Sequence, residues 1–428
     1  MTITADSTNA RAAAAADSAA ATTPHFAPAT AASARSYAEL AAKYRPIFER
    51  IAAGAAEREA NRELLHRQIG GLAAAGFGAV RVPREFGGGG ASAPQFFRLL
   101  VELAAAESNI AQALRSHVAF VEGRLYANDA GWLRRVGEGS ILGNAWTETG
   151  PVAVGGVGTT IERDGEGFRI NGTKYYTTGS LYADWIQTGA RTADGQDIIA
   201  LVKSDAAGVR IEDDWDGFGQ RLTASGTTVF DNVLVPASDV LVETDQAPYT
   251  TGVYQLIHVA TLAGITRRVV RDAAALVRGR SRVFSHGNGV PPREDIQVQQ
   301  IVGELSAKAF TAEAAVERVA NLLQEATELR AAGAVPAALE EAVHLVEFGS
   351  SQAQIVVTDL AQRASTSLFD ALGASAAKTE LQLDRHWRNA RVISSHNPVV
   401  YKSRIVGDWE INGTVPEFVW RSGTAAGS

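Results

Sequence analysis

With 428 residues, of which 46% are hydrophobic and 20% charged, the chain has the composition of a globular protein and the length for two or three structural units. Its net charge of −7, with lysines and arginines scattered along the sequence, argues against a surface for nucleic acid or for an anionic membrane. The lack of cysteine excludes disulfides, thiolate metal sites and a cysteine nucleophile, and is compatible with a reducing compartment.

Residues 1–35 are rich in alanine, serine and threonine, and they lack the basic and apolar segments of a signal peptide. We expect a disordered tail here. No stretch reaches the roughly 18 consecutive apolar residues that a membrane-spanning helix requires. The sequence therefore predicts a soluble, cytoplasmic protein that contacts neither membranes nor nucleic acids.

The period of the hydrophobic pattern divides the rest of the chain into three parts. In residues 36–140 apolar side chains recur every three or four positions, which predicts an all-α domain. In residues 141–245 short β-branched or aromatic runs alternate with turns, which predicts a compact antiparallel β-barrel or sandwich. Residues 246–428 contain amphipathic runs at 261–278, 295–326, 336–364 and 381–391. These runs predict a C-terminal four-helix bundle with spare apolar surface for subunit assembly, and hence an α+β multidomain fold.

Common catalytic and nucleotide-binding motifs are missing. There is no G-x-G-x-x-G between a strand and a helix, no Walker A motif and no G-x-S-x-G elbow, so a nicotinamide in a Rossmann cleft and a serine hydrolase are disfavoured. The eight histidines include no H-E-x-x-H pair, so no metal site is evident. The chemistry must then come from another cofactor or from polar side chains.

Several motifs, in a fixed order, resemble the acyl-CoA dehydrogenase superfamily. They are VPREFGG (82–88), NAWTE (144–148), NGTKYYTTG (171–179), GFGQRLTASG (217–226) and FDNVLVP (230–236). The resemblance as a whole extends over nearly everything after residue 36. The resemblance implies an N-terminal helical domain, a central β domain, a C-terminal bundle and a homotetramer.

Within that superfamily the details are most similar to the reduced-flavin monooxygenase branch, formed by the dibenzothiophene monooxygenases and the sulfur-acquisition oxidoreductases. The segments that carry this similarity are DWDG (214–217), DRHWRNAR (384–391) and HNPVVYK (396–402). Where the dehydrogenases carry a proton-abstracting glutamate, this chain has Ser394, Ser395 and His396. A second glutamate site of some dehydrogenases falls near His258. Removing a weakly acidic C–H proton needs a base of suitable pKa, and neither place offers the family's carboxylate.

The branch resemblance implies a two-component enzyme. Reduced FMN, supplied by a separate flavin reductase, reacts with O2 to a C4a-hydroperoxyflavin that oxygenates a sulfur or nitrogen centre of a small-molecule substrate. Because histidine can also act as a base, an FAD-dependent acyl-CoA dehydrogenase stays an alternative. A third alternative is a catalytically silent member of the superfamily that acts only as a binding or assembly module.

For the flavin ring, the resemblance implies contacts from the β domain. The Thr178 hydroxyl, expected on a barrel strand, would lie beside the N5 and O4 edge, with Tyr176 against the ring face. Asn144 would face the flavin, and the loop with Trp146 and Thr147 would meet the pyrimidine edge. Thr178 as an ordinary strand threonine and Asn144 as a turn residue are the alternatives.

Two histidines are candidates for catalysis. His396 could donate a hydrogen bond to the distal oxygen of the flavin hydroperoxide, although a histidine before Asn397-Pro398 is also typical of a turn. The resemblance places His117 in the substrate pocket, although a lone helix histidine is often a packing residue.

The flavin phosphate is expected to meet Arg282, Phe284 and Ser285, in a segment that the resemblance brings across a subunit interface. A guanidinium suits a phosphate, but a solvated basic helix end is the alternative. The segment departs from the arginine-x-glutamine-phenylalanine pattern of the dehydrogenases. The choice between FMN and FAD as the cofactor therefore stays open.

Overall fold

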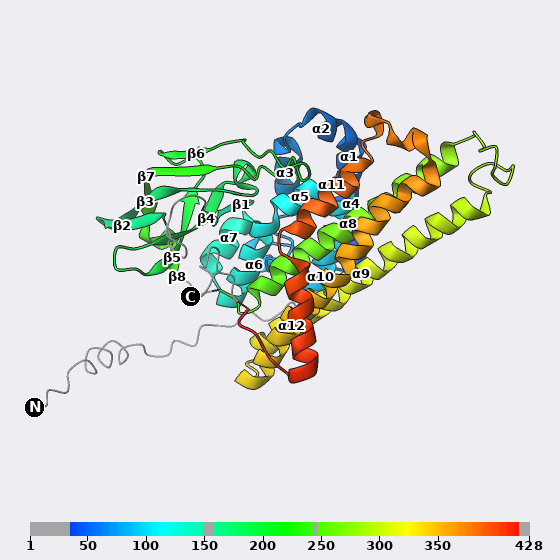
Figure 1. Cartoon of the computed structure of the whole chain (residues 1–428). Helices are drawn as coiled ribbons and strands as arrows, with labels where there is room; N and C mark the ends of the chain where they lie inside the picture. Colours follow the sequence, from blue (N-terminus) through cyan, green and yellow to red (C-terminus); the bar gives the residue numbers. More distant parts are fainter. Residues whose placement is uncertain (1–34, 149–157, 243–245, 419–428) are drawn as a thin grey trace, which may run out of the picture.

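The computed structural model describes residues 35–148, 158–242 and 246–418, and Figure 1 shows a β domain beside a larger helical body. The chain begins with short helices: α1 (Tyr37–Ala53), α2 (Ala55–Asn61), α3 (His66–Ala74), α4 (Ala93–Ala106), α5 (Ser108–Ala113), α6 (Arg115–Ala127) and α7 (Ala130–Gly137). Capping boxes start α1 and α4, in which Ser36 and Ser92 accept from the backbone three residues later. Most of α4 is buried, because α1, α8 and α9 all pack against it.

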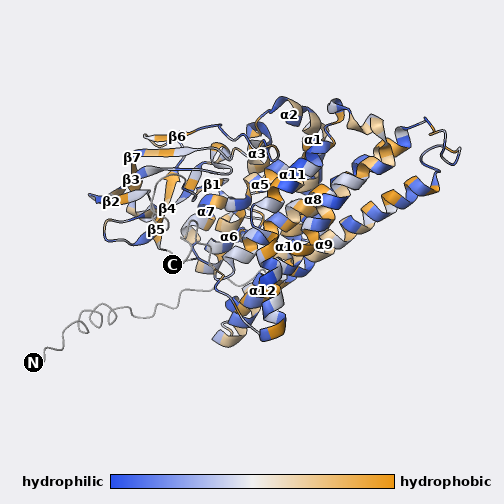
Figure 2. Ribbon diagram, in the orientation of Figure 1, coloured by the Kyte–Doolittle hydropathy of each residue, from blue (hydrophilic) through white to orange (hydrophobic). Residues whose placement is uncertain are grey.

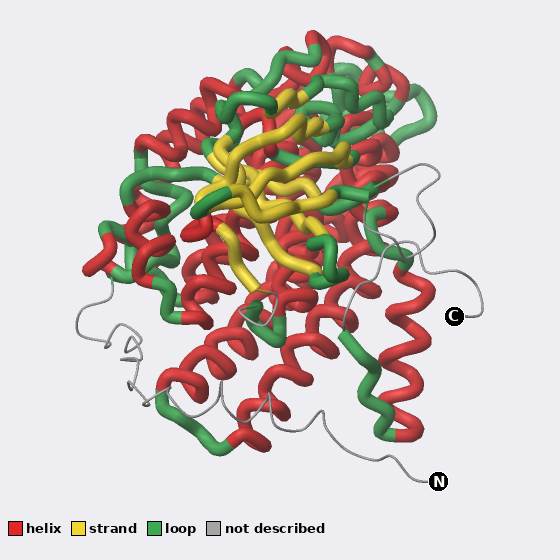
Figure 3. The backbone as a smooth tube through the Cα atoms, turned by 90° about the vertical axis from the view of Figure 1, so that its left-hand side faces the viewer, coloured by secondary structure: helices red, strands yellow, loops and turns green. Residues whose placement is uncertain are grey.

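The central domain is a single sheet, seen in front of the helices in Figure 3. Its strands are β1 (Leu142–Ala145), β2 (Thr160–Asp164), β3 (Gly167–Lys174), β4 (Trp185–Arg191), β5 (Asp197–Lys203), β6 (Val209–Ile211), β7 (Thr228–Pro236) and β8 (Val240–Val242). The strand order is β6-β7-β3-β2-β4-β5-β8, with β1 also paired to β4.

The sheet differs from the expected antiparallel domain in one detail. Most pairs are antiparallel, but β1 and β2 each run parallel to β4, so the sheet is mixed. Alternating polarity indicates a strand without indicating the direction of its neighbour. Parallel pairing needs a long crossover, and here β2 and β3 lie between β1 and β4 in the sequence.

Within residues 246–418 the C-terminal region has three long α-helices and two shorter ones: α8 (Thr250–Gly279), α9 (Ile296–Ala331), α10 (Pro336–Leu372), α11 (Asp384–Ser395) and α12 (Val399–Asn412). Hydrophobic and hydrophilic residues alternate along these helices in Figure 2, as amphipathic packing requires. At Gly264 a Cβ would lie 2.4 Å from the Cβ of Ala104, so α8 and α4 touch almost backbone to backbone. The expected α+β fold class is thus confirmed.

One continuous core joins the N-terminal helices to the bundle, whereas the β domain has its own core. A smaller cluster with Phe120, Trp132 and Leu201 connects α6 and α7 to the sheet. The region between α6, α8 and the sheet is therefore the place where the two bodies meet. Among the described helices, none combines the length and the apolar character needed to cross a bilayer.

Candidate functional site

The turn after β3 holds Thr178 in a network of hydroxyl groups. Its Oγ1 lies 2.8 Å from Ser225 Oγ, which lies 2.8 Å from Thr223 Oγ1. Thr178 is buried, but β3 ends at Lys174, so the expectation that Thr178 lies on a strand is wrong. The reason is local: Tyr176 has a φ of 55° and Gly179 a φ of 79°, and two left-handed residues so close together turn the chain.

This turn presses against the helical body. A Cβ on Gly179 would lie 2.1 Å from the carbonyl oxygen of Ala113, the last residue of α5. On its other side, Ser180 Oγ donates to the carbonyl oxygen of Asn144 at 3.0 Å. The turn therefore ties β1 to the start of α6, where Arg115 follows two residues after Ala113.

Two buried amides face each other across β1 and β4. Asn144 and Gln187 are register partners, and the side-chain oxygen of each lacks a hydrogen-bond partner among the described residues. An unpaired buried amide oxygen is costly unless a ligand or water satisfies it. These oxygens suit hydrogen-bond donors on the edge of a bound ring.

The loop after β1 is anchored by an ion pair. Glu148 accepts from the Lys174 Nζ of β3, and Thr147 O accepts from Tyr175 N at 2.8 Å. The Trp146 indole lies over β4, where a Cβ on Gly189 would come within 2.8 Å of the ring. The structure thus holds Trp146 and Thr147 beside the turn that carries Tyr176.

Tyr176 is 54% exposed, and its ring meets Trp215 edge to face at a centroid distance of 6.1 Å. Exposed aromatic rings beside unpaired amides form a surface on which a planar heterocycle can stack. The predicted flavin residues of the β domain thus lie on β1, the loop after it and the turn after β3, segments that are joined by the Tyr175–Thr147 and Ser180–Asn144 hydrogen bonds.

At the end of α11, His396 pairs with His258 of α8. Their ring centroids are 4.6 Å apart. His258 is fully buried, and neither of its ring nitrogens has a hydrogen-bond partner among the described residues. Burial, then His396, then Arg115 lower the pKa of His258 well below its ordinary value.

His396 is accessible to solvent as a residue, yet its ring packs against His258 and is partly desolvated. This desolvation and the nearby positive charge of Arg115 lower the pKa of His396. A hydrogen bond with Asn397 opposes this shift without cancelling it. We therefore assign a neutral ring at pH 7, able to donate at one nitrogen and accept at the other.

The serines before His396 offer no base. Ser394 Oγ donates to Ala390 O at 2.7 Å, and Ser395 Oγ donates to Arg391 O at 2.9 Å. Both hydroxyls thus bond to their own helix, as serines commonly do. His396 is the titratable group of this segment.

His117 does not join this group of residues. Its Nε2 lies 2.9 Å from Gly78 O, and its Nδ1 accepts from Leu142 N at 3.3 Å. The ring is buried, which lowers its pKa, and the main chain occupies both nitrogens. The structure thus corrects the expectation of a pocket residue: His117 links α6 to β1 as a packing histidine.

Arg282, Phe284 and Ser285 lie in the connection between α8 and α9, at the end of the bundle opposite the β domain (Figure 1). All three are exposed, and Phe284 is 71% accessible. They do not meet the other predicted flavin residues within one chain. Any contact with a flavin phosphate would have to be made in a neighbouring subunit.

A small, open hollow lies where the two bodies meet. It is lined by Gln187 of β4, by Phe120 and Arg124 of α6, and by Thr250 and Tyr254 of α8. Gln187 connects this hollow to Asn144. Tyr254 connects it to Arg115, whose guanidinium carbon lies 5.0 Å from the tyrosine ring centroid.

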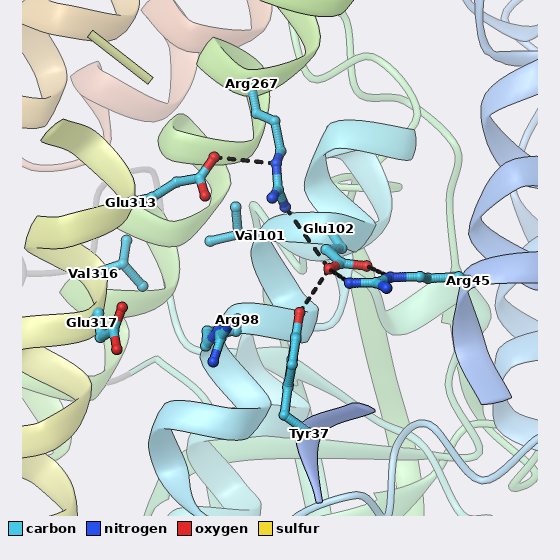
Figure 4. A pocket seen from close by; sticks show the side chains of 9 residues that line it. All are labelled: Tyr37, Arg45, Arg98, Val101, Glu102, Arg267, Glu313, Val316 and Glu317. Atoms are coloured by element: carbon cyan, nitrogen blue, oxygen red, sulfur yellow. Dashed lines mark hydrogen bonds and ion pairs between the residues drawn. The ribbon is translucent and has the colours of Figure 1, made fainter. Parts of the chain in front are cut away.

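A second hollow, between α1, α4, α8 and α9, is of another kind (Figure 4). Glu102 accepts from the Tyr37 hydroxyl at 2.6 Å and from Arg45 at 2.7 Å, and Arg267 pairs with Glu313 at 3.1 Å. These charges largely compensate one another. We interpret the group as a structural network that joins the N-terminal helices to the bundle.

The sequence matches the acyl-CoA dehydrogenase N-terminal domain over residues 35–129, the middle domain over 144–233 and the C-terminal domain over 256–401. The chain belongs to the acyl-CoA dehydrogenase superfamily. The matches agree with the succession of helices, sheet and bundle in the structure.

Several relatives within the superfamily are monooxygenases. The chain is 28% identical over 401 residues to a dibenzothiophene monooxygenase of Rhodococcus qingshengii, covering 87% of this chain and 93% of the relative. It is 26% identical over 389 residues to the probable FMNH2-dependent monooxygenase SfnC of Pseudomonas putida, covering 87% and 94%. FMN-bound TdsC from Paenibacillus sp. A11-2 superposes with a TM-score of 0.81 at 29% identity, covering 90% of this chain and 100% of that chain. The assignment to the flavin-dependent monooxygenase branch is confirmed.

Sequence reasoning missed Arg115, Tyr254 and Gln187. The only signal was an arginine among apolar residues at the start of a helix, in the run Leu114-Arg115-Ser116-His117-Val118. Nothing in that run says whether a carboxylate elsewhere pairs with the guanidinium.

Proposed function

We propose that the protein is the oxygenase of a two-component system. It takes reduced FMN from a separate reductase and uses O2 to oxygenate a sulfur or nitrogen centre of a small molecule. The observation that carries this proposal is the pair of His258 and His396, where dehydrogenases of the superfamily carry glutamates. Burial and the charge of Arg115 lower the pKa of both rings, so proton abstraction from carbon is disfavoured.

The residues present fit a flavin. Asn144 and Gln187 offer unpaired amide oxygens, Thr178 offers a hydroxyl, and Tyr176 offers an exposed ring. Reduced FMN held by these residues would supply the activation of O2 from which an oxygen atom is transferred. Trp146 and Thr147 would flank the ring from the loop that Glu148 and Lys174 hold in place.

His396 would act by hydrogen bonding. As a neutral ring it donates one N–H to a developing oxygen charge without first becoming an imidazolium. His258 packs against it from the buried side and limits its orientations. Water is excluded on that side, because α8 buries His258 completely.

Single turnovers with ¹⁸O2 test the proposal. Purified protein given photoreduced FMN and a panel of sulfides, sulfinates and amines should place one labelled oxygen in a product. His396→Ala should lower the rate by about 100-fold, the range expected for a positioned proton donor. It should leave FMN affinity, measured by fluorescence titration, unchanged.

His66→Ala is the matched control, because His66 is an exposed histidine on α3. Unlabelled product, or full activity of His396→Ala, would contradict the mechanism. Anaerobic bleaching of bound oxidised flavin by an acyl-CoA would identify a dehydrogenase instead. Failure to bind any flavin would indicate a silent binding module.

We further propose a cytoplasmic homotetramer. Apolar side chains are left exposed on two helices, with Phe310 of α9 at 76% and Ile411 of α12 at 81% accessibility, as surfaces that assemble often are. Assembly would also let Arg282 and Ser285 reach a flavin in a neighbouring subunit. Sedimentation velocity should give a tetramer, and a monomer would refute this. Cell fractionation should find the protein with cytoplasmic markers.

A further inference from the structure

Arg115 stands apart from the other buried arginines of the described residues. Each of the others pairs with a carboxylate within 4 Å: Arg58 with Glu107, Arg81 with Glu122, Arg124 with Asp129 and Arg385 with Asp272. Arg115 is only 6% exposed, yet it forms no ion pair and no hydrogen bond with any described residue. Its one recorded partner is the ring of Tyr254. A buried charge without a counter-charge is rare, because desolvation is costly.

The surroundings of Arg115 are positive or neutral. The charge of Arg115 acts on His258, His396 and Tyr254, and it lowers the pKa of both histidines. Burial lowers the pKa of Arg115 itself, but a guanidinium stays protonated under working conditions. The local field therefore favours an anion that the described protein does not supply.

Hydrogen-bond donors are also left over nearby. Gln255 uses its side-chain oxygen to accept from Asn397 at 3.1 Å, while its Nε2 has no partner among the described residues. His258 has both ring nitrogens unpaired, as noted above. Gln255 and His258 lie one turn apart on α8, and Tyr254 precedes them on the same helix. Donors of α8 and the Arg115 cation of α6 thus lie on two helices that pack together, and Tyr254, which contacts Arg115, also lines the hollow.

We propose that Arg115 binds the anionic head group of the substrate, an oxyanion such as a sulfinate, sulfonate or carboxylate. Tyr254 supports the guanidinium by a cation–π contact, and Gln255 and His258 complete the recognition by hydrogen bonds. The inference rests on the proposed monooxygenase function, and it narrows the substrate to small organic anions. A neutral substrate would leave the Arg115 charge buried and unpaired.

Calorimetric titration of the full-length protein tests this without turnover. The probes are benzenesulfinate, benzenesulfonate and benzoate, with uncharged methyl phenyl sulfone as the matched neutral compound. Wild-type protein should bind at least one anion about 10-fold more tightly than the sulfone. Equal or tighter binding of the sulfone would overturn the proposal, and this comparison needs no variant.

Arg115→Met replaces the guanidinium over Tyr254 by an uncharged side chain of similar length. It should weaken binding of the anions by about 10- to 100-fold, as expected when a charge-assisted hydrogen bond is lost, and leave the sulfone unchanged. Arg115→Lys should lose less, because it keeps the charge but not the planar fork. Arg98→Met is the control: Arg98 also stacks on a tyrosine, Tyr37, but in the other hollow.

A parallel titration with reduced FMN separates substrate from cofactor. If Arg115→Met lost flavin affinity while the anions bound as before, Arg115 would face the cofactor and the proposal would be wrong. Failure of the monooxygenase function has a different signature, because ¹⁸O would then be missing from every product even when the anions bind in an Arg115-dependent way.

Discussion

Glu347 of α10 is buried completely, and its pKa makes stability depend on pH. Burial raises this pKa from 4.5 to about 7, although Thr251 and Gly252 donate hydrogen bonds to the carboxylate and Lys402 attracts it. Between pH 4.5 and 7 the unfolded chain therefore loses a proton that the folded protein keeps. Stability should fall as pH rises through this window and level off above it. The shift corresponds to about 3 kcal/mol of unfolding free energy.

Glu347→Gln should abolish this dependence, because an amide does not titrate. The difference in unfolding free energy between variant and wild type, from urea titrations, should grow by about 3 kcal/mol in favour of the variant from pH 4.5 to 7.5. Glu340→Gln, an exposed position on the same helix, is the control and should change little with pH. Infrared spectra at pH 6 should show a protonated carboxyl band that Glu347→Gln removes. A pH-independent difference would refute the reasoning.

Three further predictions concern the site. Gly179→Ala should destabilise the protein by about 2 kcal/mol or more, because its Cβ would strike Ala113 O and its φ is positive, and thermal unfolding measures this. Lys174→Met should leave the partly buried Glu148 without its ion-pair partner, and should therefore weaken FMN binding in fluorescence titrations. Unchanged FMN affinity would show that this loop does not contribute to flavin binding. His117→Phe should cost about 2 to 4 kcal/mol, because two main-chain groups lose a partner, while the rate per folded molecule stays within about twofold. If the catalytic rate of that variant fell while its folded fraction did not, His117 would be a residue of the substrate pocket after all.

Much of the architecture could be predicted, because burial on one face leaves a period in the sequence. The change from helical spacing to alternation near residue 141 coincides with β1, and the return of long amphipathic runs coincides with α8. Parallel pairing of β1 with β4 could not be predicted, since it depends on the path that the chain takes between these two strands. The strand expected at Thr178 was wrong for a local reason, because Tyr176 adopts a left-handed conformation that a tyrosine rarely takes.

Site residues that belong to a family motif could be predicted from the sequence. Residues whose role depends on the groups that they contact in the folded protein could not. Asn144, Trp146, Thr147, Tyr176 and Thr178 lie on neighbouring segments of the β domain, and their contacts with a flavin stay a prediction. His117 looked like a second catalytic histidine, and only the carbonyl of Gly78 and the amide of Leu142 show that its ring is already occupied.

By itself, the sequence determined the order of helices, sheet and bundle, and the replacement of a glutamate region by Ser394, Ser395 and His396. Only the tertiary structure decided that α6, α8 and α11 bring Arg115, His258 and His396 to one place without a described carboxylate among them. The physical reason is that desolvation and charge pairing depend on which distant segments pack together. The sequence alone does not show whether a buried arginine is neutralised by a carboxylate of the protein or by a bound substrate.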